Sequence, residues 1–252
     1  MSALKDKVVF VTGASSGIGR SCARAFAAQK ARVLVCARRD ERLAKLAEEL
    51  KKEFGVPVRH FVLDVRNRTA VEKAMAALPE DWRSVEVLVN NAGLSRGLDK
   101  LHQGLQDDWE EMIDANVKGL LYVSRAVLPG MVERGRGHVI NIGSIAGREV
   151  YPNGNVYCAT KFAVRALSQG LRLDLSGTPI RVSEVSPGMV ETEFSLVRFH
   201  GDAERAGKVY QGLTPLGPDD IADAVVWCAT RPLHVNVSDV VIWPTAQASP
   251  SL

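Results

Sequence analysis

A serine, a tyrosine and a lysine have the spacing needed to move a proton to or from an alcohol oxygen. Ser144 precedes Tyr157 by thirteen residues, and Lys161 follows Tyr157 by four. Residues four apart share one helix face, so the ammonium can lie beside the phenol. A unit charge about 4 Å away contributes roughly 4 kcal/mol at a dielectric of ~20, enough to lower a phenol pKa of ~10 by a few units.

Such a phenol can act as a general acid or base, with Ser144 holding the substrate oxygen. On this spacing alone, an ordinary amphipathic surface helix also explains the Tyr157/Lys161 pair. The sequence around these residues, which sets the helices and strands that would position them, is needed to choose between the two interpretations.

The composition is that of one globular α/β protein. The chain has 252 residues, 46% hydrophobic and 24% charged, with a net charge of +3, which suits a single large domain. No basic block carries interleaved aromatic residues, so we expect no nucleic-acid partner. No apolar run approaches the length of a membrane-spanning helix, and residues 1–7 lack the apolar core of a secretory signal. We expect a cytoplasmic protein without a membrane partner.

The four cysteines carry no recognisable metal or disulfide pattern. Cys22, Cys36, Cys158 and Cys228 are scattered, without a CxxC or Cys/His pairing. They are typical of small buried side chains in a reducing compartment. We therefore expect neither a metal site nor a disulfide framework.

Short apolar runs alternate with helix-period segments from one end of the chain to the other. The predicted strands are 7–12, 31–37, 58–62, 87–90, 138–142, 181–186 and 237–243. The predicted helices are 17–29, 40–54, 69–78, 107–132 and 155–176. Pro129 is expected to end or kink the helix 107–132. Continuous β-branched runs separated by helices predict one doubly wound α/β (Rossmann) domain over 1–252, a seven-stranded parallel sheet with helices on both faces.

A glycine-rich turn lies between the first predicted strand and the first helix. Residues 12–19 have the sequence TGASSGIG, in which glycines let the backbone turn tightly and approach a pyrophosphate at a helix N-terminus. The Gly-x-x-x-Gly-x-Gly spacing differs from the commoner Gly-x-Gly-x-x-Gly fingerprint. The residues predicted to contact a dinucleotide here are Gly13, Ser15, Ser16, Gly17, Ile18 and Gly19.

The end of the second strand indicates which dinucleotide is bound. NAD sites usually have an acid at this point, to bind the ribose hydroxyls. Here Ala37 is followed by Arg38 and Arg39, and an arginine can pair with a 2′-phosphate. The alternative is a pair of solvated arginines at a helix start. NADP(H) is the predicted cofactor.

Together these pieces resemble the short-chain dehydrogenase/reductase family over essentially the whole chain. The matching motifs, in chain order, are Thr12-Gly13-x-x-x-Gly17-x-Gly19, Asp64-Val65, Asn90-Asn91-Ala92-Gly93, Asn116, Ser144, Tyr157-x-x-x-Lys161 and Pro187-Gly188. The resemblance implies a homotetramer, with helices 107–132 and 155–176 at one interface and the last strand at another.

The resemblance also implies a role for each matching residue. Tyr157 is the implied general acid/base, Lys161 lowers its pKa and binds the nicotinamide ribose, and Ser144 orients the substrate oxygen. Asn116 holds a water in a proton relay to Lys161. The remaining implied cofactor contacts are Asp64 and Val65 at the adenine, Asn91, Ala92 and Gly93 at the centre, and Pro187, Gly188, Val190 and Thr192 at the nicotinamide.

The region 189–215 is expected to form a loop over the substrate. Its stretch 192–199, TEFSLVRF, resembles the NADP-dependent 3-hydroxy acid dehydrogenase branch, which acts on serine, allo-threonine and 3-hydroxyisobutyrate. Arg148, which begins an Arg-Glu-Val departure from that branch, and Arg198 are the candidates to bind a substrate carboxylate. The alternatives are a broad carbonyl, ketone or 3-oxoacyl reductase and, more remotely, a non-catalytic NADP(H) sensor.

Overall fold

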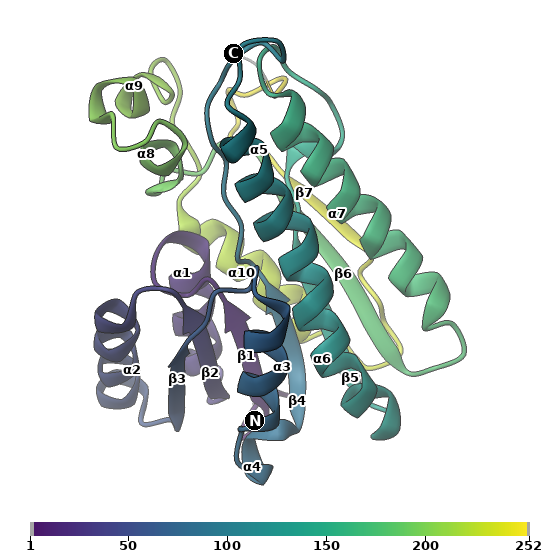
Figure 1. Ribbon diagram of the computed structural model, residues 1–252. Helices are drawn as coiled ribbons and strands as arrows, with labels where there is room; N and C mark the ends of the chain where they lie inside the picture. Colours follow the sequence, from purple (N-terminus) through teal and green to yellow (C-terminus); the bar gives the residue numbers. More distant parts are fainter. Residues whose placement is uncertain (1–2, 251–252) are drawn as a thin grey trace.

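Seven parallel strands form one sheet in the order β3-β2-β1-β4-β5-β6-β7 (Figure 1). The computed structural model describes residues 3–250, so the ends of the predicted domain, 1–2 and 251–252, lie outside the described residues. The strands are β1 (Val8–Thr12), β2 (Arg32–Ala37), β3 (Val58–Val62), β4 (Val85–Asn90), β5 (Gly137–Ile142), β6 (Ile180–Pro187) and β7 (Asp239–Ile242). Each overlaps a predicted strand, and the predicted parallel sheet is confirmed.

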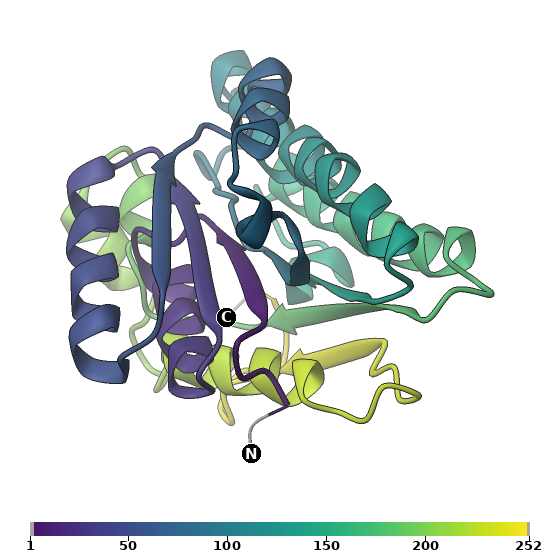
Figure 2. The ribbon, with the colours of Figure 1, turned by 90° about the horizontal axis from the view of Figure 1, so that it is seen from below.

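Helices cover both faces of the sheet, as Figure 2 shows from below. One layer contains α1 (Gly17–Ala28), α2 (Asp40–Phe54) and α10 (Pro218–Ala229). The other contains α3 (Arg68–Ala76), α6 (Gly119–Glu133) and α7 (Asn155–Asp174). The doubly wound prediction is therefore confirmed. The sequence patterns did not predict α10, nor the short helices α4 (Glu80–Arg83), α8 (Phe194–Arg198) and α9 (Ala203–Lys208).

Successive side chains of the buried strands point to opposite faces of the sheet and pack into two separate hydrophobic cores. Val9 and Val11 of β1 face the layer that contains Phe26 of α1. Phe10, between them, faces the layer that contains Val127 of α6. Burying a side chain of this size contributes roughly 1.5–3 kcal/mol. Because both faces of the sheet are covered, the strand ends are held rigidly.

The long helix predicted over 107–132 is interrupted, but not at Pro129. α5 (Gln106–Ile113) leads into a π-helical turn, Asp114–Lys118, and α6 then continues past Pro129 to Glu133. The prediction of a break at Pro129 is wrong, because this proline lies on the exposed face of α6, where the carbonyl that it frees can reach water. The actual irregularity surrounds Asn116.

The carboxyl ends of the strands bring the motif residues to one edge of the sheet. The glycine-rich turn follows β1, Arg38 follows β2, Asn91 follows β4 and Ser144 lies just beyond β5. The strand order reverses between β1 and β4, which is where doubly wound sheets open a crevice for a ligand. In Figure 1, α8 and α9 lie beyond this same edge. Within residues 3–250, no helix is long and apolar enough to cross a bilayer.

Candidate active site

A cavity of ≈ 330 Å³ opens at the carboxyl edge of the sheet. This volume lies within the range of small-molecule and cofactor sites. Its lining includes these residues predicted to bind NADP: Gly13, Ser15, Ser16, Gly17, Ile18, Arg38, Arg39, Asp64, Val65, Asn91, Ala92, Gly93, Tyr157, Lys161, Pro187, Gly188, Val190 and Thr192. Gly19 lies behind the lining.

The glycine-rich turn is clamped against the turn that follows β4. Thr12 Oγ1 accepts hydrogen bonds from the backbone N–H groups of Asn91 (3.1 Å) and Ala92 (3.0 Å), and Asn91 Nδ2 donates to Thr12 O at 2.9 Å. Gly13 has φ +67°, and a Cβ there would come within 2.9 Å of Ala92 Cα. A Cβ at Gly19 would collide with Asn91 Nδ2. Side chains are therefore excluded at both glycines.

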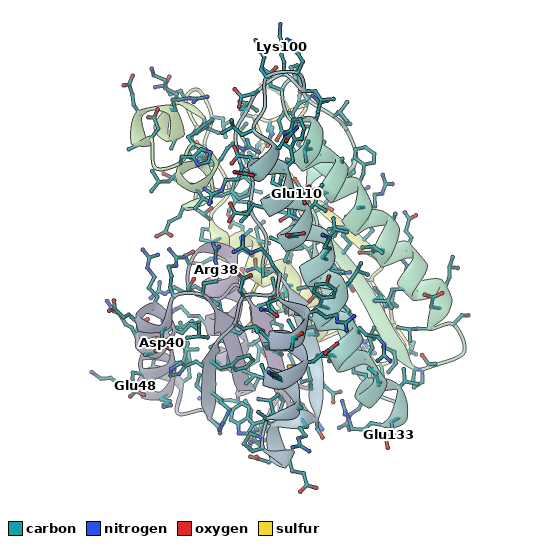
Figure 3. The ribbon with its side chains drawn as sticks, in the orientation of Figure 1. Arg38, Asp40, Glu48, Lys100, Glu110 and Glu133 are labelled. Carbon is teal, nitrogen blue, oxygen red and sulfur yellow. The ribbon has the colours of Figure 1, made fainter. Side chains whose placement is uncertain are left out.

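The arginines after β2 form an exposed basic end of the cavity. Figure 3 shows Arg38 where the chain leaves β2, and Asp40 and Glu48 along α2. Arg39 donates to Ser15 Oγ and Ser16 Oγ and pairs with Glu193 at 2.9 Å. Arg38 Nη1 lies 3.5 Å from Glu111 Oε1. Hydrogen bonds from Arg39 and Arg42 hold the pKa of Glu193 below its ordinary value.

Asn116 locks the π-helical turn onto two other elements. Its Nδ2 donates to Leu94 O at 2.8 Å and to Thr160 Oγ1 at 3.0 Å, and its Oδ1 accepts from Leu94 N at 2.8 Å. Thr160 is the neighbour of Lys161 on α7. Both amide hydrogens of Asn116 are thus taken by protein groups, so a relay water would have to bind through other atoms.

Ser144, Tyr157 and Lys161 meet at the buried end of the cavity. Each is only 8% exposed. Tyr157 and Lys161 lie in α7, and Ser144 is the N-cap of the 3₁₀ turn Ile145–Gly147. Lys161 Nζ donates to Ile142 O at 3.0 Å. The predicted helical pair and its serine partner are therefore brought together by β5 and α7.

The electrostatics of Tyr157 differ from the sequence expectation. Burial raises the pKa of Tyr157 above its ordinary value, while the Arg198 guanidinium and a hydrogen bond with Ser144 oppose the rise. The cation over the ring is Arg198, 5.2 Å from the ring centroid, whereas Lys161 Nζ is 5.9 Å away and turned to a backbone carbonyl. Burial lowers the pKa of Lys161 to about 8, against the opposing charge of Glu184.

Arg198 is held over the Tyr157 ring by two residues from the body of the domain. Its Nε donates to Ser95 Oγ at 3.0 Å, and its Nη2 donates to Tyr151 Oη at 2.7 Å. The guanidinium also lies 5.2 Å from the ring centroid of Phe194, which packs edge-on against Tyr157. Arg198 therefore supplies a positive charge beside Tyr157.

Neither arginine predicted to bind a substrate carboxylate is among the residues that line the cavity, but the Arg198 guanidinium lies 5.2 Å from the Tyr157 ring centroid. Arg148 follows the turn that Ser144 caps, and its Nη2 forms an ion pair with the carboxylate of Asp239 on β7. The turn carries this side chain toward the β7 edge of the sheet. The structure therefore does not bring Arg148 to the site, and the prediction narrows to Arg198.

Some residues of the site have no sequence signal of their own. Tyr151 and Ser95 lie 47 and 103 residues from Arg198 in the sequence. Local residue spacing therefore cannot predict that they contact it. Phe194 and Val197 line the cavity from α8. The only sequence signal for these two residues was their position inside the predicted substrate loop, 189–215. The helix α8 is too short to show a clear hydrophobic periodicity.

Known proteins resemble this chain in sequence and fold. A short chain dehydrogenase family model matches residues 7–201. The NADP-dependent 3-hydroxy acid dehydrogenase YdfG of Salmonella typhi is 54% identical over 242 residues, 96% of each chain. Sulfoacetaldehyde reductase 2 of Chromohalobacter salexigens is 46% identical, over 96% of this chain and 95% of the relative. A structure of the closed form of serine dehydrogenase complexed with NADP⁺ is 49% identical, with a TM-score of 0.92 over 97% of this chain and 98% of that one. The chain belongs to the short-chain dehydrogenase family.

Proposed function

We propose that this protein is an NADP-dependent oxidoreductase that interconverts the hydroxyl and keto forms of a small 3-hydroxy acid of the serine, allo-threonine or 3-hydroxyisobutyrate type. The observation that carries the proposal is the buried Ser144, Tyr157 and Lys161 set with the Arg198 guanidinium over the tyrosine ring. Relatives whose names include NADP-dependent 3-hydroxy acid dehydrogenase and serine dehydrogenase support it.

The residues of the cavity fit a dinucleotide phosphate. α1 begins at Gly17 without an acidic residue in its first turn, and its N-cap Ser16 forms no side-chain capping bond. The N–H groups of that turn are thus available to a pyrophosphate. Arg38 and Arg39 lie where a 2′-phosphate would be bound, and no acid occupies their place. NADP⁺, when bound, supplies the hydride acceptor.

The protein's own groups would handle the proton. Tyr157 takes the hydroxyl proton in oxidation and returns it in reduction, and Ser144 holds the reacting oxygen within reach. The Arg198 guanidinium and the hydrogen bond with Ser144 favour the phenolate, so each offsets part of the desolvation that raises the pKa of Tyr157. Protonated Lys161 would bind the nicotinamide ribose. Asn116 fixes the turn that orients α7. These are the four predicted catalytic residues, with Arg198 added.

The substrate carboxylate would be bound by Arg198. A 3-hydroxy acid carries its carboxylate two carbons from the reacting hydroxyl, so a cation beside Tyr157 would be placed to bind it. The Arg198 guanidinium lies 5.2 Å from the Tyr157 ring centroid. Residues 189–215 would form the loop that carries this arginine across the substrate. Its bonds to Ser95 and Tyr151 preorganise the guanidinium.

A coenzyme-linked substrate screen tests this function. NADP⁺ reduction would be followed with L-serine, allo-threonine and 3-hydroxyisobutyrate, and NADPH oxidation with simple ketones and acetoacetyl thioester. Turnover of the hydroxy acids at far higher kcat/KM than of uncharged alcohols is expected. Equal or better turnover of uncharged ketones or of the thioester would instead establish a broad carbonyl or 3-oxoacyl reductase.

A sulfonate-bearing aldehyde is a second candidate substrate. A relative of 46% identity is named sulfoacetaldehyde reductase 2, and a guanidinium can also pair with the anionic oxygens of a sulfonate. Sulfoacetaldehyde therefore belongs in the screen with NADPH. A non-catalytic NADP(H) sensor is the remote alternative, and it would bind the coenzyme tightly without turning over any compound in the panel.

The assembly would be a homotetramer in the cytoplasm. Leu121 and Val132 of α6 and Phe162 and Leu173 of α7 are exposed apolar side chains, as is Val241 of β7. They lie on the helices and the strand expected at the two interfaces. The four cysteines are free and buried, in keeping with a reducing compartment. Light scattering of the purified protein tests the tetramer.

A further inference from the structure

A buried carboxylate in β6 has no part in the proposed proton transfer. Glu184 is 2% exposed and lies opposite Asn141 of β5 and Asp239 of β7 in the sheet register. Among residues 3–250, no lysine, arginine or histidine forms an ion pair with it. A buried carboxylate without an ion-pair partner is costly, so its position within the sheet points to a role.

The carboxylate of Glu184 is packed under the turn that carries Ser144. Its Oε1 accepts a hydrogen bond from Ser186 Oγ at 2.6 Å. A Cβ at Gly143 would lie 2.5 Å from Ser186 Oγ and would collide with Glu184 Oε1. Gly143 follows Ile142, whose carbonyl accepts from Lys161 Nζ. The carboxylate therefore lies against the backbone that binds the ammonium.

The negative charge of Glu184 acts on Lys161. Burial lowers the pKa of Lys161 to about 8, and Glu184 is the group that opposes this loss of charge. The neighbouring anion on β7, Asp239, is already paired with Arg148. The cations on the neighbouring elements are Arg165, one turn further along α7, and Arg198 over the Tyr157 ring. The charge that acts on Lys161 is that of Glu184.

We propose that Glu184 is a positioning residue that keeps the Lys161 ammonium charged and bound to the Ile142 carbonyl. β6 packs beneath α7 (Figure 1), so the carboxylate acts through the Gly143 turn without entering the cavity. This inference deepens the proposed function and rests on it, because the role of Lys161 belongs to that function.

Replacing Glu184 by the isosteric glutamine tests the charge with little change in volume. The titration of Lys161 would be followed directly, by acetylating the native protein with acetic anhydride over a range of pH and quantifying the Lys161 peptide by mass spectrometry. Only the neutral amine reacts. In E184Q the midpoint should fall by about one pH unit. An unmoved midpoint in a folded E184Q protein overturns the proposal.

Two further variants complete the test. E184D keeps the carboxylate but shortens the side chain by one methylene, which moves the charge away from Lys161. The acetylation midpoint of Lys161 in E184D should therefore lie between those of the wild type and E184Q. If E184Q does not fold, an E184D midpoint equal to that of the wild type overturns the proposal. Glu86→Gln is the matched control, because Glu86 lies on β4 and pairs with Arg136. Its midpoint should equal the wild-type value.

Kinetics separate this inference from the proposed function. Under the proposed function, reduction requires protonated Lys161, so kcat/KM should be lost as pH rises through the pKa of Lys161. The alkaline limb of the pH profile should then move to lower pH in E184Q. Full turnover by Tyr157→Phe would refute the proposed function, while the acetylation midpoints would still report on Glu184. An inactive Tyr157→Phe together with unmoved midpoints would refute the Glu184 role alone.

Discussion

The two ends of the cavity differ in their contact with water. Ser144, Tyr157 and Lys161 are each 8% exposed. At the other end, the side chains of Arg38 and Arg39 are 52% and 44% exposed. Desolvation shifts the pKa values of Tyr157 and Lys161 at the buried end, whereas solvent and salt screen the ion pairs at the exposed end.

This difference matches what each end is proposed to do. Proton transfer depends on pKa values tuned in a site that excludes water. Binding of a phosphate needs hydrogen-bond donors and positive charge, and exposed arginines at a solvated surface supply both. Substitutions should therefore have their largest effects at the buried end and their smallest at the exposed arginines. Four substitutions test that ranking.

Tyr157→Phe should have the largest effect. Loss of the phenol removes the general acid/base, so kcat should fall about 10²–10⁴-fold while NADPH affinity, measured by fluorescence titration, is retained. Tyr122→Phe on α6 deletes the same atom outside the cavity lining and is the matched control. Comparable kcat in the two variants would remove the buried end from the mechanism.

Arg198→Met should raise the KM for a hydroxy acid about 10- to 100-fold, because the charge-assisted bonds to the carboxylate are lost. The KM for an uncharged ketone should change little. Arg148→Met removes an arginine that pairs with Asp239 on β7 and is the control. If the KM for hydroxy acids rises in Arg148→Met and not in Arg198→Met, the choice between the two arginines is reversed.

Arg38→Ala should raise the KM for NADPH about tenfold and leave that for NADH nearly unchanged, because only NADPH carries the 2′-phosphate. The measurement is the ratio of the two KM values at fixed salt. An equal rise for both coenzymes would show that the arginine does not distinguish them. The effect should shrink as salt is added.

Glu193→Gln should have the smallest effect, in the opposite direction. Glu193 pairs with Arg39 and Arg42 and so competes with a phosphate for their guanidinium groups. Its neutralisation should lower the Kd for NADPH about two- to fivefold, as expected for an exposed pair. Isothermal titration with NADPH and NADH checks this. A weaker NADPH affinity would mean that Glu193 organises the arginines instead.

The fold and most of the coenzyme site were predictable because their signals are local. Buried strands of a parallel sheet are continuous apolar runs, and the Gly13 and Gly17 turn needs residues that tolerate positive φ. The break at the π-helical turn was not predictable, since propensity points to Pro129. Only the exposure of that proline in the folded helix explains why α6 continues past it.

The sequence by itself determined the sheet, the glycine-rich turn, the arginines after β2 and the Ser144, Tyr157 and Lys161 spacing. These follow from periodicity and short-range chemistry. The tertiary structure alone decided which arginine overlies Tyr157, that Ser95 and Tyr151 hold this arginine, and that Glu184 lies against the turn before Ser144. Such contacts join segments tens of residues apart, and their strength depends on burial, which spacing along the chain does not determine.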